Sequence, residues 1–359
     1  MGCARTGLDV GTKPADAGPT ACEAGTLTVG SPVRKAAAAQ APLGGSVLDP
    51  DDDLLIVIGG LSSSGVAAQS ISAVRLGTAE AITLARTGDS RVDLGPALRA
   101  VWDPTSHRVL ALGGSLWNQV PNPPDDTKQV FALSVSGQSA DLALLPEFPD
   151  GETADVPLAA AVDPAGARLL AMPEKGSVAG PTKTWAMSTS PGGETWSLLD
   201  TDDDPAILSV QFSSLSYDPQ RRRMIALGTT FDTNVASLWA LSLDAPAGWS
   251  QLAGTLPPGL AHYAFILSTG FPLVWDDAAC GFLAAVTDGY CGYQVWKLDL
   301  GDDAFTASPV GTAAQSLTRY SRGAGWLDLA RGNFVFPSGF DCEEHDYVAG
   351  SVEFLPVTP

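Results

Sequence analysis

Short apolar runs recur along the chain, and each is followed by an aspartate, a tight turn and a second apolar run. These aspartates, called the anchors here, are Asp49, Asp103, Asp163, Asp218, Asp276 and Asp328. Successive anchors are 54, 60, 55, 58 and 52 residues apart. An Asp side chain accepts hydrogen bonds from backbone N–H groups just after it, and a following proline presets φ for a turn. Each copy is therefore predicted to be a β-hairpin.

Two further features repeat with the anchors. The residue before each anchor is apolar or aromatic, as Leu48, Trp102, Val162, Tyr217, Trp275 and Leu327. Arg108, Arg168 and Arg223 each lie five residues after their anchor, where each can reach back across the turn to the aspartate. The alternative is a solvated arginine at a turn, and a pair at the surface would contribute little to stability.

A third and a weaker fourth strand follow each hairpin. Segments such as ISAVRL and SLWALSLD alternate apolar and polar residues, the period of a half-buried strand. Four strands in every 50 to 60 residues, repeated six times, predict an all-β fold, a six-bladed β-propeller over residues 21–359. The last unit lacks a fourth strand. The register places Leu27, in Gly25–Val29, at that position, so an N-terminal strand is predicted to close the last blade.

The pattern resembles the Kelch repeat, and the chain from about residue 21 onward resembles the six-bladed propellers of the galactose-oxidase type. The matching features are an aromatic-Asp-Pro turn, paired glycines and paired tryptophans on the outer strands: Gly59-Gly60, Gly113-Gly114, Trp185/Trp196 and Trp239/Trp249. The resemblance implies a fold but no single function, because Kelch-like propellers include peptide-binding domains, sugar oxidases and sialic acid isomerases.

Composition narrows the class of partner. The 359 residues are 45% apolar and 17% charged, which excludes a disordered chain. Forty acidic residues against twenty basic ones give a net charge of −20, and this field repels nucleic acid. The strongest apolar run, Leu54–Ile58, has the length of a strand rather than the roughly 18 residues of a membrane span.

The first twenty residues are small, polar and rich in Gly and Pro, and are expected to be a flexible tether before the propeller. No apolar signal region precedes Cys3. A cysteine at the head of such a linker nevertheless resembles a mature bacterial lipoprotein, in which Cys3 would carry the lipid and form the sole membrane contact. The alternative is a disordered terminus with an incidental cysteine. The lipoprotein interpretation implies an extracytoplasmic protein, in the periplasm or at the cell surface.

The other four cysteines allow three pairings and show no zinc-type spacing. In an extracytoplasmic protein disulfides are favoured, and free buried thiols are the alternative. The register places Cys291 and Cys342 in loops on one face of adjacent blades, so they are predicted to pair. It places Cys22 and Cys280 at the opposite face, where a second bond is a candidate.

The candidate ligand site is at the mouth of the central channel, on the face where the loops between second and third strands meet the blade-to-blade loops. Exposed aromatic side chains among carboxylates suit a polar organic ligand or a peptide. The alternative is a solvated rim of loops. The candidate residues are Trp117, His262, Tyr263, Asp288, Tyr290, Arg322, Phe340, Glu343 and His345.

Signals for catalysis are weak. Of the three histidines, His107 is predicted in a turn on the other face, and His262 and His345 alone argue against a copper site of the sugar-oxidase kind. No GxSxG, HExxH or P-loop motif occurs. Acidic runs at 51–53, 202–204 and 302–303 offer oxygen ligands for Ca²⁺, but none has EF-hand spacing and solvated turns are commoner. No cofactor is therefore predicted.

The sequence thus favours a monomeric, lipid-anchored bacterial binding or scaffold protein that engages a partner protein or a glycan through the channel-mouth loops. One alternative is a carbohydrate-active enzyme that uses Tyr263, Asp288, Arg322, Glu343 and His345 around the channel. Another is a structural component of a surface assembly.

Overall fold

In the computed structural model, all regular structure of the described residues is β-strand. Within them, no helix is long and apolar enough to cross a bilayer. The structure describes residues 27–30, 33–36, 45–60, 68–95, 98–113, 128–149, 159–172, 183–199, 210–230, 235–244, 248–257, 273–277, 279–287, 292–316, 319–320, 326–341 and 347–358.

The strands of these ranges form a series of antiparallel sheets in chain order. An eight-stranded sheet contains β3 (Gly45–Asp49), β4 (Leu54–Ile58), β5 (Ile71–Arg75), β6 (Glu80–Gly88), β7 (Arg99–Asp103), β8 (Arg108–Leu112), β9 (Val130–Ser136) and β10 (Ser139–Leu144). Three four-stranded sheets follow. The first contains β11 (Ala159–Asp163), β12 (Arg168–Met172), β13 (Thr184–Ser188) and β14 (Trp196–Leu199), and the second contains β15 (Val210–Asp218), β16 (Arg223–Thr230), β17 (Ala236–Ser242) and β18 (Trp249–Gln251). The third contains β19 (Val274–Asp276), β20 (Gly281–Thr287), β21 (Gly292–Leu300) and β22 (Phe305–Ser316). The last sheet joins the chain ends, with β1 (Thr28–Val29), β2 (Val33–Ala36), β23 (Arg319–Tyr320), β24 (Trp326–Asp328), β25 (Asn333–Asp341) and β26 (Tyr347–Thr358).

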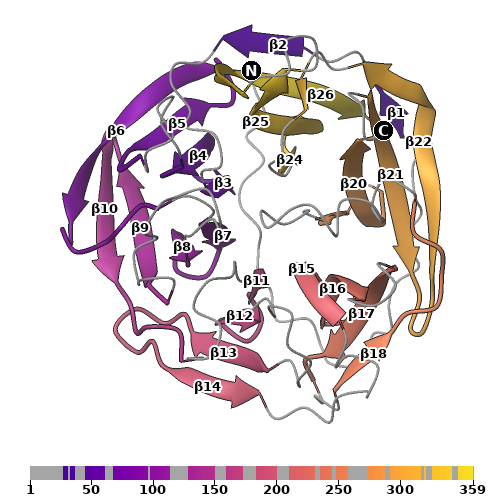
Figure 1. Ribbon diagram of the computed structural model, residues 1–359, viewed down its shortest axis with the longest axis horizontal. Coiled ribbons are helices and arrows are strands. Elements are labelled where there is room, and N and C mark those ends of the chain that lie inside the picture. The colour runs from indigo at the N-terminus through magenta and orange to yellow at the C-terminus, as the bar shows by residue number, and fades with distance from the viewer. Residues whose placement is uncertain are drawn as a thin grey trace, which may run out of the picture.

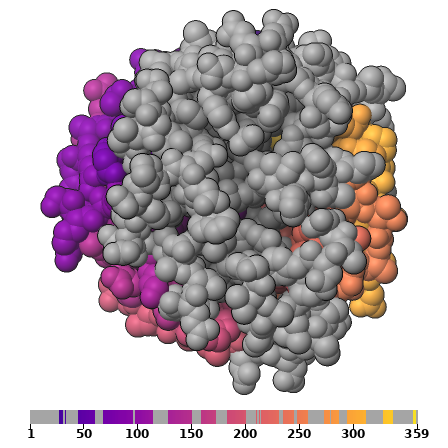
Figure 2. All heavy atoms as spheres, in the orientation of Figure 1, coloured from indigo at the N-terminus to yellow at the C-terminus, as the bar shows by residue number. Residues whose placement is uncertain are grey.

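The sheets are arranged around a central axis like the blades of a propeller (Figure 1). Strands β3, β7, β11 and β15 lie nearest the axis, and β6, β10, β14 and β18 lie at the periphery. The eight-stranded sheet consists of two four-stranded halves whose outermost strands, β6 and β10, pair in parallel. Figure 2 shows the described residues at the rim of this face, with β6 on the left in purple and β22 on the right in orange. The fold is therefore all-β and propeller-like.

The hairpins at Asp49, Asp103, Asp163, Asp218 and Asp328 follow the local chemistry that the sequence predicts. Backbone N–H groups of the turn donate to the Oδ1 atom of the anchor, from Asp51 to Asp49 at 3.0 Å and from Gln220 to Asp218 at 3.1 Å. Strand pairing then resumes at the fifth residue after the anchor, as in the pair Asp49–Leu54. Five of the anchors, all except Asp276, are almost fully buried, so these hydrogen bonds also satisfy carboxylates that water reaches poorly.

The fourth residue after every anchor has a positive φ, a feature that the sequence pattern does not predict. Five of these residues carry a side chain, namely Asp53, His107, Ala167, Arg222 and Cys280, with φ between 46° and 58°. The sixth is Gly332, with φ 62°. A left-handed residue at the end of a turn of this length turns the chain back into the second strand.

Two of the three predicted Arg–Asp pairs are confirmed. Arg168 Nε donates to Asp163 Oδ2 at 2.9 Å, and Arg223 Nε donates to Asp218 Oδ2 at 3.0 Å. The prediction is wrong for Arg108, whose Nε donates to Ser106 Oγ at 2.8 Å. Ser106 itself donates to Asp103 and occupies the oxygen that the arginine would have needed.

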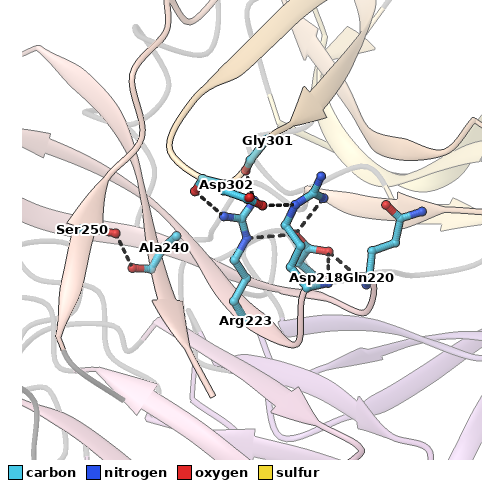
Figure 3. A network of polar contacts seen from close by, with 8 residues as sticks. Asp218, Gln220, Arg223, Ala240, Ser250, Gly301 and Asp302 are labelled. Carbon is cyan, nitrogen blue, oxygen red and sulfur yellow. Dashed lines mark hydrogen bonds and ion pairs between the residues drawn. The ribbon is translucent and has the colours of Figure 1, made fainter. Parts of the chain in front are cut away.

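The same arginines also bind the next sheet, at the turn between its third and fourth strands. Arg108 Nη2 reaches Thr189 O and Glu194, both at 2.9 Å. Figure 3 shows that Arg223 donates to Gly301 O at 2.6 Å and to Asp302 O at 2.8 Å. Arg168 Nη2 reaches Leu243 O at 3.4 Å. These three arginines, called the clamp arginines below, join neighbouring sheets by hydrogen bonds to charged and carbonyl groups.

Aromatic side chains of the β15–β18 sheet pack together and share one apolar cluster with Leu170 and Met172 of the preceding sheet. Phe212 packs edge-on against Trp239, with ring centroids 6.3 Å apart, and lies 5.5 Å from Trp249. The indole N–H of Trp249 donates to Thr184 Oγ1 at 2.9 Å, and this bond connects β18 to β13 of the preceding sheet. The tryptophans that stand out in the sequence thus contact across the boundary between sheets.

The N-terminal strands close the last sheet, as the register predicts. Val29 of β1 pairs with Val357 of β26, and Val33 of β2 pairs with Phe354 farther along the same strand. Leu27 packs with Val29 against the apolar cluster that contains Ala279 and Leu355. The two ends of the chain are therefore held together by strand pairing and by side-chain packing.

Candidate functional site

A cavity of about 480 Å³ lies on the axis, and the innermost strands β3, β7, β11, β15, β19 and β24 all line it. Strands β3, β7, β11, β15 and β19 are end strands of their sheets or half-sheets, so each has one edge without a neighbouring strand. The cavity walls therefore combine backbone groups with the side chains of these strands. Its volume is in the range of pockets that hold small organic ligands.

A ring of apolar and aromatic side chains surrounds the cavity near the hairpin turns. It is built from the residue before each anchor, and we call it the collar: Leu48, Trp102, Val162, Tyr217, Trp275 and Leu327. The repeat noticed in the sequence thus has a structural meaning, because one register position in every unit faces the same space. Trp102, Tyr217 and Trp275 remain partly exposed, so their faces are accessible to a ligand.

The surroundings of two collar aromatics fix the position of Trp275 and the charge state of Tyr217. The indole N–H of Trp275 donates to Asp277 Oδ1 at 2.8 Å, and its ring packs edge-on against Phe282 at 5.4 Å. Burial raises the pKa of the Tyr217 hydroxyl above its ordinary value, and the negative charge of Asp163 adds to the shift. Tyr217 is therefore neutral at physiological pH and serves as an apolar ring with a hydrogen-bonding tip.

A second set of residues, three positions earlier in the register of four units, lines the cavity farther from the turns. We call it the deep layer, and its members are Gly45, Arg99, Ala159 and Ser214. Arg99 is 7% exposed and Ser214 is 6% exposed, so both polar groups are removed from bulk water. Ser214 Oγ has no hydrogen-bond partner in the described structure. Between the deep layer and the collar several side chains are small, among them Ala100 and Ala160, and they leave room for the cavity.

The cavity extends to the hairpin turns, where Pro50, Pro104 and Pro164 line it. Two acidic residues at this end are held by one arginine. Arg331 donates to Asp53 at 2.6 Å and to Asp328 at 3.0 Å, and these bonds raise the pKa of the guanidinium. The described carboxylates beside the cavity therefore already have a cationic partner.

The channel-mouth loops chosen from the sequence lie mainly outside the described residues. Those not described are Trp117, His262, Tyr263, Asp288, Tyr290, Arg322, Glu343 and His345, together with Cys3, Cys22, Cys291 and Cys342. Phe340 belongs to β25, where its backbone pairs with Tyr347 of β26. Cys280 lies in the turn between β19 and β20 and is disulfide-bonded, and its partner lies outside the described residues.

Acidic runs predicted as possible Ca²⁺ ligands make other contacts where they are described. Asp51 contacts His107, Asp53 binds Arg331, and Asp302 accepts a hydrogen bond from Arg221 at 3.3 Å. The described ranges contain no cluster of three or more His, Cys, Asp or Glu side chains suited to a metal ion. Residues 202–204 lie outside those ranges.

The sequence analysis expected a central channel but did not identify the residues that line its cavity, although the signal was present. The apolar residue before each anchor was visible as a repeat, but its direction depends on how the sheets are arranged around the axis. The deep layer had no repeated signal, since its residues differ from unit to unit.

Comparison with known proteins supports the fold alone. Neither a scan against protein-family models nor a search of the curated proteins found a match. Among solved structures, the chain is similar to the major Malassezia sympodialis allergen Mala s 1, with a TM-score of 0.53 and 10% sequence identity. The similarity covers 90% of this chain and 96% of the allergen. The arrangement of sheets over nearly the whole chain is thus one that is found in solved proteins.

Proposed function

We propose that this protein is a binding protein that takes a small organic ligand in the axial cavity of a six-bladed, Kelch-like propeller. The collar is the observation that carries the proposal. Six register-equivalent side chains, three of them aromatic, surround a space of ligand size, and aromatic faces bind apolar ligands well. The ligand would be an organic molecule with an apolar body.

The six-blade count is supported by the repeat itself. Each anchor hairpin is followed by at least one further antiparallel strand, and the N-terminal strands supply the outermost position of the last unit. The Kelch-like assignment is supported by the Asp-Pro turns and the outer-strand tryptophans, which pack between neighbouring sheets.

Binding is favoured over catalysis because the described carboxylates that line the cavity already have hydrogen-bond and ion-pair partners. Asp53 and Asp328 line the cavity but share Arg331, and Asp328 also accepts hydrogen bonds from turn N–H groups. A carboxylate engaged in this way is a poor general base. A carbohydrate-active enzyme, or a protein or glycan site on the loops of the other face, depends on residues outside the described ranges and stays a sequence prediction.

An extracytoplasmic location remains part of the proposal. It is supported by the disulfide at Cys280, because such bonds persist in oxidising compartments and are rare in the cytosol.

The test is binding of a neutral apolar fluorophore, N-phenyl-1-naphthylamine, to the purified protein. Replacing Ala160 by Phe puts a ring into the cavity and is expected to weaken binding by about tenfold or more. Ala143→Phe is the matched control, because Ala143 is an exposed residue of the peripheral strand β10 and the same ring there leaves the cavity open.

Three outcomes decide the proposal. Saturable binding that is lost in Ala160→Phe but retained in Ala143→Phe supports it, provided that both variants unfold at temperatures close to that of the wild type. Absence of saturable binding by the wild type, or equal affinity in both variants, overturns it.

A further inference from the structure

We infer that the ligand of the axial cavity is an organic cation, an alkylated ammonium group on an apolar body, whose charged end is bound at the collar. This inference rests on the proposed function and specifies its ligand class. Two observations carry it. Three aromatic collar residues line the cavity and remain partly exposed, and the carboxylates at this end of the cavity outnumber the cation that binds them.

The aromatic collar residues supply the binding surface for a cation. Trp102, Tyr217 and Trp275 come from three different sheets and line the same cavity. The face of an aromatic ring carries partial negative charge and attracts a cation within about 6 Å of its centre, most strongly when the ring is an indole. The alkyl groups of an alkylated ammonium also fit the apolar members of the collar, such as Leu48 and Val162.

Carboxylates at the turn end add electrostatic attraction. Asp53 and Asp328 line the cavity and share the single guanidinium of Arg331, so two negative charges stand against one positive charge. Asp103, the anchor that follows a collar tryptophan, is buried and accepts hydrogen bonds from the backbone N–H of Thr105 at 3.0 Å and from its hydroxyl at 2.6 Å. These donors bring no positive charge. Attraction to a cation is stronger here than in bulk water, because the local dielectric constant is lower.

The described arginines near the aromatic collar residues each bind a carboxylate. Arg222, which contacts the Tyr217 hydroxyl, pairs with Asp244 at 2.8 Å. Arg168 and Arg223 bind their own anchors at 2.9 and 3.0 Å. These cations therefore offset individual carboxylates and leave the surplus of negative charge at the collar in place.

The size of the cavity indicates that the ligand also has an apolar body. A volume of about 480 Å³ is much larger than an ammonium group needs, and the small side chains of Ala100 and Ala160 leave room beyond the collar. An ammonium group among the collar aromatics places the body of the ligand beside these alanines. Ala160→Phe is therefore expected to weaken binding of cationic and neutral ligands alike.

The test uses two compounds of the same shape. Phenyltrimethylammonium and tert-butylbenzene differ only in a positively charged nitrogen that replaces a carbon. Each is used to displace N-phenyl-1-naphthylamine from the purified protein, and the ratio of the two affinities measures the preference for the cation. An apolar cavity that does not recognise charge would bind the neutral compound better, because water solvates the cation. The wild type is instead expected to bind the cation about tenfold more tightly.

Two variants remove the two sources of attraction separately. Trp102→Leu keeps an apolar side chain but removes a ring, and Asp53→Asn removes a charge and keeps a residue type that tolerates the φ of 58° at this position. Each is expected to lower the affinity ratio about fivefold. Trp102→Phe keeps a ring and is expected to retain most of the preference. Asp303→Asn is the control for net charge, because Asp303 is exposed in the turn between the outer strands β21 and β22, and the ratio is expected to stay unchanged.

The outcomes separate this inference from the proposed function. If N-phenyl-1-naphthylamine does not bind the wild type, the proposed function and the inference fail together. If it binds but the neutral compound displaces it as well as the cation does or better, the inference is overturned and the cavity remains a site for neutral ligands. A preference for the cation that survives in both Trp102→Leu and Asp53→Asn, or that falls equally in Asp303→Asn, also overturns it.

Discussion

The left-handed residue four positions after each anchor is the residue-scale feature that every unit shares. At five of these positions the chain has a side chain in a conformation that L-residues adopt at a cost, and at the sixth it has Gly332. The positive φ favours glycine at position 332, and the space there requires it. A Cβ at position 332 would lie 2.4 Å from the carbonyl oxygen of Val357, whose own backbone N–H donates a hydrogen bond to the Gly332 carbonyl.

We predict that Gly332→Ala lowers the free energy of unfolding by at least about 2 kcal/mol. Gly137→Ala is a matched control, because Gly137 also has a φ of 62° but a Cβ there would meet nothing within 4 Å. The control is expected to cost only about 1 kcal/mol, the penalty of the left-handed backbone. Urea unfolding of both variants measures the difference, and equal losses would show that the contact with Val357 relaxes freely.

The pair His107–Asp51 gives a residue-scale prediction for pH. The hydrogen bond to Asp51 raises the pKa of His107 above its ordinary value, and the charges of Asp51, Asp103 and Asp49 act in the same direction. A raised pKa in the folded state means that the pair stabilises the protein below the unfolded value near 6.5, and that this contribution is lost as the pH rises through the folded pKa. NMR titration should place the His107 midpoint above that of an unfolded peptide, and Asp51→Asn should bring it down. A midpoint unaffected by Asp51→Asn would contradict the assignment.

Local chemistry explains which features were predictable at this scale. The anchors and two of the Arg–Asp pairs depend on groups within five residues of each other, so spacing alone was sufficient. The prediction for Arg108 was wrong because Ser106, which is not part of the repeat, donates to Asp103 in place of the arginine. The polar residues of the deep layer could not be predicted, since Arg99 and Ser214 come from different sheets and share no sequence pattern.

At the scale of elements, the clamp arginines link sheets that the sequence shows only as repeated units. The side chain of Arg223 is 7% exposed and bonds both to its own anchor, Asp218, and to two carbonyls of the next sheet. Asp218 is fully buried, so removing the arginine leaves much of a carboxylate's charge uncompensated away from water.

Arg223→Met is therefore expected to lower the free energy of unfolding by about 3 kcal/mol. The adjacent Arg222 is the matched control. It pairs with Asp244 at 2.8 Å, but both side chains are more than half exposed, and Arg222→Met is expected to change stability by less than about 1 kcal/mol. Similar losses in the two variants, measured by denaturant unfolding, would argue against a special role for the buried clamp.

At the scale of the whole molecule, the boundary between the β19–β22 sheet and the closing sheet differs from the clamped boundaries. The clamp position five residues after Asp276 is Gly281, where a Cβ would already lie 2.9 Å from Leu298 O. No clamp arginine fits there. The preceding residue is Cys280, which carries a disulfide. The disulfide of Cys280 therefore lies at the boundary between the β19–β22 sheet and the closing sheet, in which β1 pairs with β26.

We predict that Cys280 pairs with Cys22. In the sequence, Cys291 and Cys342 come next to strand ends that lie far from Cys280. Thr287, which pairs with Tyr293, is seven residues after Cys280, and seven residues span about 23 Å along β20. A disulfide requires Cα atoms within about 7 Å of each other. Cys22 is five residues before Leu27, which packs in the same cluster as Ala279. Peptide mapping without reduction should find Cys22–Cys280 and Cys291–Cys342, and a Cys280–Cys291 peptide would refute the prediction.

The pairing of β1 with β26 also has a consequence for how the protein is made. Val29 meets Val357, 328 positions later in the chain, so the ring cannot close until β26 has been synthesised. Earlier sheets can form from neighbouring residues as they emerge, but closure must wait and carries the largest loop entropy in the fold. The ring-closing step is thus expected to be slow, and a chain that lacks its last dozen residues would retain formed blades around an open seam.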